Sequence, residues 1–74
     1  MTYQEYKQAL AMIDDQKTEV YSQTKQQFAR ISREYMNDII TAREALDLYN
    51  EAEQEENRKI DELNSAIDAL PDYE

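Results

Sequence analysis

Apolar residues recur along this 74-residue chain at intervals that alternate between three and four positions. An α-helix has 3.6 residues per turn, so this spacing places them on one helical face. The series has twenty positions, sixteen of them apolar, and we call it the predicted seam: Tyr3, Tyr6, Leu10, Ile13, Lys17, Val20, Thr24, Phe28, Ile31, Tyr35, Ile39, Ala42, Leu46, Tyr49, Glu53, Glu56, Ile60, Leu63, Ile67 and Leu70. The pattern predicts an all-α protein whose helices pack on one another along this seam.

The alternation is interrupted twice by successive intervals of four, at Val20-Thr24-Phe28 and at Ile31-Tyr35-Ile39, and the second interruption lies at mid-chain beside Asn37 and Asp38. Short polar side chains of this kind end one helix or cap the next. The chain has no Gly, so Asn37 is the best candidate for the left-handed conformation that often follows a helix. We therefore predict one domain, an antiparallel helical hairpin with a helix over residues 2–36, a turn at 37–38, a helix over 39–70 and a frayed tail at 71–74.

Three sequence signals mark helix ends. Thr2 with Glu5, and Thr41 with Glu44, have the spacing of a capping box, in which each side chain bonds the backbone N–H of the other residue. Pro71 is expected to end the last helix, because it has no backbone N–H and disfavours helical geometry in the residue before it.

Four polar residues interrupt the predicted seam: Lys17, Thr24, Glu53 and Glu56. A parallel two-stranded coiled coil would set each glutamate against its own copy, which is unfavourable. In an antiparallel arrangement with a turn at 37–38, Lys17 lies close to Glu56, and Glu53 lies near Val20 and Thr24. We expect these four residues to form a polar layer that sets the register. A hairpin and a domain-swapped antiparallel dimer make the same pairs, so both remain open.

A second, weaker set of apolar residues lies off the predicted seam: Met12, Tyr21, Met36, Ile40 and Leu48. A two-helix hairpin has a thin core, and chains this short rarely hold together on one such core. We expect these residues to be covered by self-association, as a homodimer that forms a four-helix bundle or an antiparallel coiled coil, or by a partner helix.

The formal net charge is −9, and it lies entirely in the second half of the chain. Residues 1–37 carry five acidic and five basic groups, whereas residues 38–74 carry twelve acidic and three basic groups. Such a segment repels nucleic acid and anionic membranes, so a protein partner with a basic surface is expected. The candidate interaction residues are Tyr21, Met36, Ile40, Leu48, Glu51, Glu55 and Glu62.

The composition excludes most kinds of catalytic site. Cys, His and Gly are absent, which removes the usual zinc ligands, the common nucleophile-base pairs and phosphate-binding loops. We expect no catalytic residues, no cofactor and no bound metal. The apolar runs are short, so neither a membrane span nor a signal peptide is predicted, and a cytoplasmic location is expected.

Three functions remain on these grounds. The leading one is a non-enzymatic protein that acts by protein-protein interaction, such as a phage- or mobile-element-type regulator of a host protein. The alternatives are a nucleic-acid-mimicking inhibitor of a DNA-binding protein and a structural or assembly subunit, such as a scaffold or chaperone-like protein. A continuous acidic face would favour the mimic, whereas interruption by Arg43, Arg58 and Lys59 would favour the interaction protein.

Overall fold

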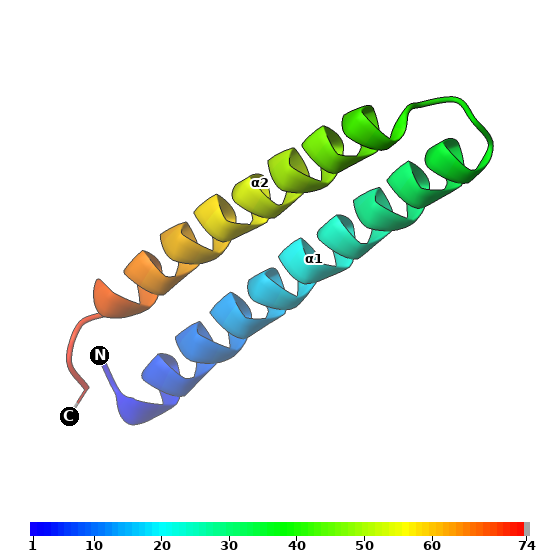
Figure 1. Cartoon of the computed structure of the whole chain (residues 1–74). Helices are drawn as coiled ribbons and strands as arrows, with labels where there is room; N and C mark the ends of the chain where they lie inside the picture. Colours follow the sequence, from blue (N-terminus) through cyan, green and yellow to red (C-terminus); the bar gives the residue numbers. More distant parts are fainter. Residues whose placement is uncertain (74) are drawn as a thin grey trace.

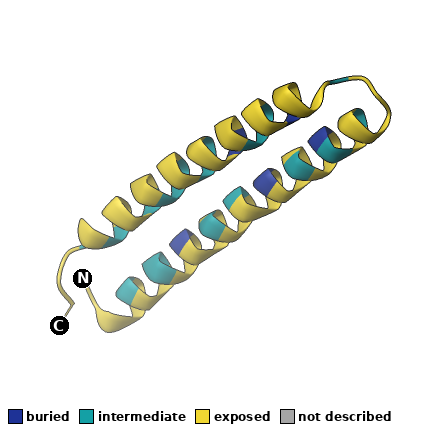
Figure 2. Ribbon diagram, viewed as in Figure 1, coloured by how far each residue is buried: buried dark blue, intermediate teal, exposed yellow. Residues whose placement is uncertain are grey.

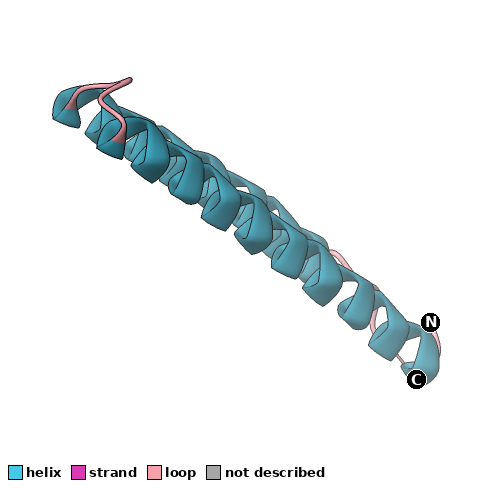
Figure 3. Ribbon diagram, turned by 90° about the vertical axis from the view of Figure 1, so that its right-hand side faces the viewer, coloured by secondary structure: helices cyan, strands magenta, loops and turns pink. Residues whose placement is uncertain are grey.

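The computed structural model describes residues 1–73, and over that range the chain is a hairpin of two long helices (Figure 1). The helix α1 spans Tyr3–Met36 and the helix α2 spans Ala42–Asp68, with no strand in the described chain. The two helices run antiparallel and side by side, and the two ends of the chain meet opposite the turn (Figures 1 and 3). The predicted all-α hairpin is confirmed.

Both predicted capping boxes are present. The Glu5 N–H donates to the Thr2 hydroxyl at 3.2 Å, and the Thr2 N–H donates to the Glu5 carboxylate at 3.4 Å. At the start of α2 the matching distances are 3.1 Å and 3.3 Å, between Thr41 and Glu44. Because the second box satisfies the first free N–H groups of α2, the helix begins at Ala42, three residues later than predicted.

The turn is built on a left-handed aspartate. Asp38 has φ of 58°, whereas Asn37, the residue predicted to take this conformation, has φ of −94°. The Ile39 N–H donates to the Glu34 carbonyl at 2.9 Å, and the Asp38 N–H donates to the Tyr35 carbonyl at 3.1 Å. This pair of bonds is a Schellman motif, which satisfies the last carbonyls of α1 and puts the positive φ one residue after the cap.

Replacing Asp38 with glycine is expected to stabilise the hairpin by about 1 kcal/mol, because glycine has no Cβ to clash at positive φ. Chemical denaturation at neutral pH measures the change in the free energy of unfolding. Asn37→Gly is the matched control, and it should not stabilise, because Asn37 already has an ordinary φ. Asp38→Asn removes the charge and keeps a Cβ, so it separates the effect of the lost charge from the effect of relieving the steric clash at positive φ. Equal stabilisation by both glycine variants would contradict the assignment of strain to Asp38.

The helix α2 ends close to where Pro71 requires it to end. Its last residue is Asp68, and the Ala69 and Leu70 N–H groups donate to the carbonyls of Ser65 and Ile67 at 3.0 Å and 3.1 Å. Pro71 itself has no N–H and follows directly. The predicted stop is therefore confirmed, with the helix finishing two residues before 70.

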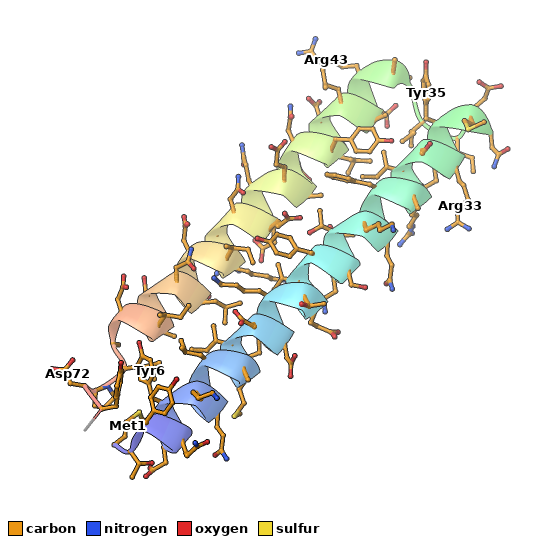
Figure 4. All side chains as sticks on the ribbon, turned by 90° about the horizontal axis from the view of Figure 1, so that it is seen from below. Met1, Tyr6, Arg33, Tyr35, Arg43 and Asp72 are labelled. Carbon is orange, nitrogen blue, oxygen red and sulfur yellow. The ribbon has the colours of Figure 1, made fainter. Side chains whose placement is uncertain are left out.

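The chain ends pack against each other. The Tyr73 ring lies 5.2 Å from the Tyr3 ring and 4.9 Å from the Tyr6 ring, and the Met1 amino group donates to the Asp72 carbonyl at 3.4 Å. Met1, Tyr6 and Asp72 gather at this end in Figure 4. The predicted frayed tail is thus folded back on α1 at residues 71–73, because aromatic stacking offsets the cost of ordering it. Glu74 lies outside the described residues.

The core is thin and consists of residues along the facing edges of the two helices (Figure 2). Within residues 1–73, no large side chain is fully buried. The Phe28 and Tyr49 rings meet edge to face with centroids 5.2 Å apart, which joins the helices near the turn. The buried residues are Ile13, Thr24, Ile31, Ala45 and Ala52.

The predicted seam is correct in α1 from Tyr6 to Ile31, and between residues 39 and 56 it is correct only at Tyr49 and Glu56. Ile39 and Leu46 were placed on the seam, yet 68% and 56% of their surface is exposed. The interface there keeps the predicted Tyr49 and Glu56 and adds Ala45, Leu48, Ala52 and Glu55. From Ile60 onward the predicted positions again face α1. The small side chains of Ala45 and Ala52 let the two helices pack closely, whereas the larger Leu46 points away from α1.

The register also differs from the prediction, because the connection spans residues 37–41. A turn at 37–38 would set Phe28 opposite Asp47, but its ring contacts Tyr49. Lys17 and Glu56 are half-buried at the interface, and within residues 1–73 they form no ion pair with each other.

The predicted polar layer is therefore only partly assembled. Thr24 is buried, and its hydroxyl donates to the Val20 carbonyl at 3.1 Å within its own helix. Glu53 lies on the exposed surface, away from Lys17 and Glu56 at the interface. That this set determines the register remains a prediction.

Candidate interaction surfaces

The two sides of the hairpin are chemically different, and their positions follow from the helical phase. Thr24 lies at the centre of the interface in α1, and Ala52 lies there in α2. A residue three positions before such a centre is rotated by about 60° to one side, and a residue three positions after it by about 60° to the other. In antiparallel helices, residues displaced in the same sense lie on the same side of the hairpin.

One side, which we call the polar side, has two shallow grooves between α1 and α2. The first groove is lined by Gln27, Arg30, Ile31, Glu34, Leu48, Glu51, Ala52 and Glu55. The second is lined by Gln16, Glu19, Val20, Gln23, Lys59, Glu62 and Leu63. Gln27 and Glu55, each three positions after the centre of its helix, share the first groove, as the helical phase requires.

Ion pairs tie the acidic groups of α2 to basic neighbours on the same helix. Arg58 bonds to Glu55, and also to Glu62 at 2.6 Å, while Lys59 Nζ lies 3.9 Å from Glu55. On α1, Arg30 Nε bonds Glu34 at 3.2 Å. All of these pairs are three or four residues apart along one helix, so they do not link the two helices.

The hydrogen bond from the Arg58 guanidinium holds the pKa of the Glu55 carboxyl below its ordinary value of 4.5, and the same bond raises the pKa of Arg58. A carboxyl whose pKa is lower in the folded state contributes stability above its unfolded pKa, and loses it as pH falls through the folded value. Arg58 is exposed and the side chain of Glu55, at the rim of the interface, is still 45% exposed, so solvent screens the pair and its contribution to stability is small. The main consequence is that Glu55 keeps its negative charge at a lower pH than a free glutamate does.

The opposite side, which we call the apolar side, has six large side chains in two matching stripes. Tyr21 lies three positions before Thr24, and Tyr49 lies three positions before Ala52, so the helical phase puts both on this side. On a helix, residues eleven or seven positions apart point in nearly the same direction. On both helices the large side chains of this side are spaced by eleven and then by seven residues. We define the apolar side by its large apolar residues, Leu10, Tyr21 and Phe28 on α1 and Tyr49, Ile60 and Ile67 on α2. The same helical phase also puts two acidic residues on this side, the exposed Asp14 and the half-buried Glu56.

None of these six side chains is fully covered by the hairpin. Tyr21 is 50% exposed, and the other five are half-buried. The sequence pattern had assigned those five to the seam between the helices. Their shared offset from Thr24 and Ala52 becomes visible only when the interface centre is known.

The structure divides the candidate interaction residues between different surfaces. Leu48, Glu51 and Glu55 line the first groove of the polar side, and Glu62 lines the second. Tyr21 is on the apolar side, so it does not join them. Met36 is 76% exposed at the last residue of α1, and Ile40 is half-buried in the connection. The remaining off-seam residue, Met12, is 64% exposed.

Two arginines lie on outer surfaces. Arg33 of α1 and Arg43 of α2 point away from the facing helix (Figure 4). Within residues 1–73, no group of three or more acidic side chains is placed to hold a metal ion. Over the same range, neither helix has a stretch long and apolar enough to cross a membrane.

Comparison with known proteins gives no relative. No protein-family model matches this chain, and neither a curated protein nor a solved structure matches it.

Proposed function

We propose that this protein is a non-enzymatic interaction module that works as a homodimer, with the apolar side as its self-association surface. The observation that carries the proposal is the surface left uncovered by the hairpin. The accessible surface is 5832 Å², against about 4,800 Å² for a compact monomer of this mass. The radius of gyration is 17.2 Å, against about 11 Å for a compact domain of this length.

The six residues of the apolar side are the part of this uncovered surface that a second layer of helices would bury. A two-helix hairpin covers only one edge of each of these side chains. In a four-helix bundle each helix instead packs against two neighbours, so side chains between the two directions of contact become core. The half-buried residues Phe28, Tyr49 and Ile60 lie in that intermediate direction. Their burial on association is the driving force of the proposed dimer.

A matched pair of variants tests this proposal. Tyr21 and Gln27 lie three positions either side of Thr24, on the apolar and the polar side respectively. Tyr21→Glu is expected to weaken self-association about tenfold or more, because it would bury a charge in the dimer interface. Gln27→Glu adds the same charge on the polar side and should leave association unchanged. Sedimentation equilibrium at 10 to 100 μM-scale loading measures both; a wild-type chain that is monomeric yet cooperatively folded would refute the dimer.

The polar side remains accessible in such a dimer, and we propose that it binds a partner protein with a basic surface. It presents Glu51, Glu55 and Glu62 in grooves that also contain the apolar Leu48. Since Arg58 and Lys59 interrupt this acidic surface, the ion pairs favour a protein-binding module over a nucleic-acid mimic. The charge density agrees: nine net charges along 57 Å are about 6 Å apart, against about 1.7 Å of axis per charge in duplex DNA.

Reversing Glu51 and Glu55 to lysine is expected to slow association with such a partner, because charge steering acts mainly on the on-rate. The wild-type on-rate should fall as salt is raised from 50 to 500 mM, while the off-rate changes little. Stopped-flow kinetics with the captured partner measures both rates. Reversal of Asp15, an exposed acid in the neutral half of the chain, is the control. An on-rate that ignores both salt and the double reversal would leave the acidic surface with no role in binding.

A further inference from the structure

At one level along the hairpin, the two edges of the apolar side carry opposite charges, whereas farther from the turn the α1 edge also carries Asp14. Lys25 follows Thr24 by one position, and Glu53 follows Ala52 by one, so each lies about 100° round its helix toward the apolar side. Both are exposed, and neither forms an ion pair within residues 1–73.

The contact between Phe28 and Tyr49 fixes their relative height along the hairpin. Lys25 lies three residues before Phe28, and Glu53 lies four residues after Tyr49. In antiparallel helices these displacements run in the same direction, so Lys25 and Glu53 are at nearly the same height. The apolar side is therefore bordered at one level by a cation on α1 and by an anion on α2.

We infer that a second copy of this chain covers the apolar side, with α1 of each copy lying on α2 of the other around a two-fold axis parallel to the helices. A rotation about that axis keeps every residue at its own height and exchanges the two edges. Lys25 of each copy then faces Glu53 of the other, and the interface contains this pair twice. The inference rests on the self-association proposed above, and it specifies the arrangement of the two copies.

The size of the apolar side agrees with this occupant. The hairpin extends over 57 by 15 Å, or about 850 Å² in outline. One partner in a standard stable interface contributes about 800 Å². The hairpin is therefore large enough to supply half of a stable dimer interface from this side alone.

Charge separates this arrangement from the other two-fold arrangement of the same surfaces. An axis perpendicular to the helices would lay α1 on α1 and α2 on α2, with Lys25 near Asp14 of the second copy. The helix α2 carries nine acidic and three basic residues, whereas α1 carries five of each. Placing two α2 helices side by side is therefore repulsive, and placing α2 on the neutral α1 is not.

A charge-swap experiment tests the pairing. Lys25→Glu alone and Glu53→Lys alone should each weaken the homodimer about tenfold or more, because each converts two attractive pairs into two repulsive ones. Mixing the two variants should yield mainly heterodimer, in which both pairs are again attractive. Native mass spectrometry of the mixture measures the heterodimer fraction. A statistical mixture, or rescue of Lys25→Glu by Asp14→Lys instead, would overturn the inference.

The direction of the axis is tested by one spin label. The chain has no Cys, so Met36→Cys puts a single label at the exposed end of α1 in each copy. With the axis parallel to the helices, both turns lie at the same end, and the two labels should be within about 35 Å by pulsed electron paramagnetic resonance. With the perpendicular axis they would be about 50 Å apart, given 1.5 Å of rise per residue.

These outcomes also separate the two levels of the proposal. A dimer with labels about 50 Å apart would overturn this arrangement and leave self-association standing. A wild-type monomer would overturn both.

Discussion

Phe28→Ala is expected to remove about 2 to 4 kcal/mol from the free energy of unfolding, the largest effect of any single truncation in this chain. Phe28 is its only phenylalanine, and its ring packs edge to face on Tyr49 with centroids 5.2 Å apart. Truncation removes this contact and leaves a cavity where the two helices meet. Because the hairpin has no fully buried large side chain to compensate, a loss of this size is a large part of its stability.

Thermal and urea denaturation followed by circular dichroism measure this loss. The matched control is Met36→Ala, which truncates a side chain that is 76% exposed at the end of α1. That change should stay within about 0.5 kcal/mol of wild type. Denaturation must be compared at equal chain concentration, because self-association would add to the apparent stability. Similar losses in the two variants would mean that Phe28 does not join the helices in solution.

Ala52→Gln is expected to destabilise the hairpin by about 2 to 3 kcal/mol. Ala52 is only 8% exposed and is one of two alanines of α2 that are buried against α1. A glutamine there either forces the helices apart or buries an amide without a partner, and both are costly. This variant tests the corrected interface of α2 directly, since the predicted seam passed through Leu46 and Glu53 instead.

The control is Ala66→Gln, the same substitution at an exposed position of the same helix, with an expected change within about 0.5 kcal/mol. Both variants change helix propensity by the same amount, so the difference between them reports burial alone. If Ala52→Gln were tolerated as well as Ala66→Gln while Leu46→Ala unfolded the protein, the predicted seam would be correct and the observed interface of α2 wrong.

Local signals were enough to predict most of the secondary structure. The capping boxes at Thr2 and Thr41 and the stop at Pro71 depend only on neighbours in sequence, so they appear where the residues require them. The stripe from Tyr6 to Ile31 follows from the sequence as well, because α1 is one continuous helix there and its apolar residues keep the helical period despite the two successive intervals of four at Val20, Thr24 and Phe28.

The phase of α2 depended on the turn, which the pattern of apolar residues did not reveal. The sequence predicts Asn37 as the left-handed residue and a connection of two residues, whereas the structure has the positive φ at Asp38 and a connection over residues 37–41. The later helix start changes the rotation of α2 about its own axis, and so changes which of its residues face α1. The predicted seam follows large apolar residues and their regular spacing, whereas close packing of helices selects small residues. The seam therefore contains Leu46 and Glu53 where the structure buries Ala45 and Ala52.

The sequence by itself determined that two long amphipathic helices form and fold back on each other, because caps, helix period and the proline stop are properties of neighbouring residues. Only the tertiary structure decided which edge of each helix is covered and which is left open. The division into a polar side with Glu51 and Glu55 and an apolar side with Tyr21 and Phe28 depends on the rotation of α2 against α1. That rotation is set by the Schellman motif at Asp38 and by the contact of Phe28 with Tyr49, which join residues that the chain alone does not bring together.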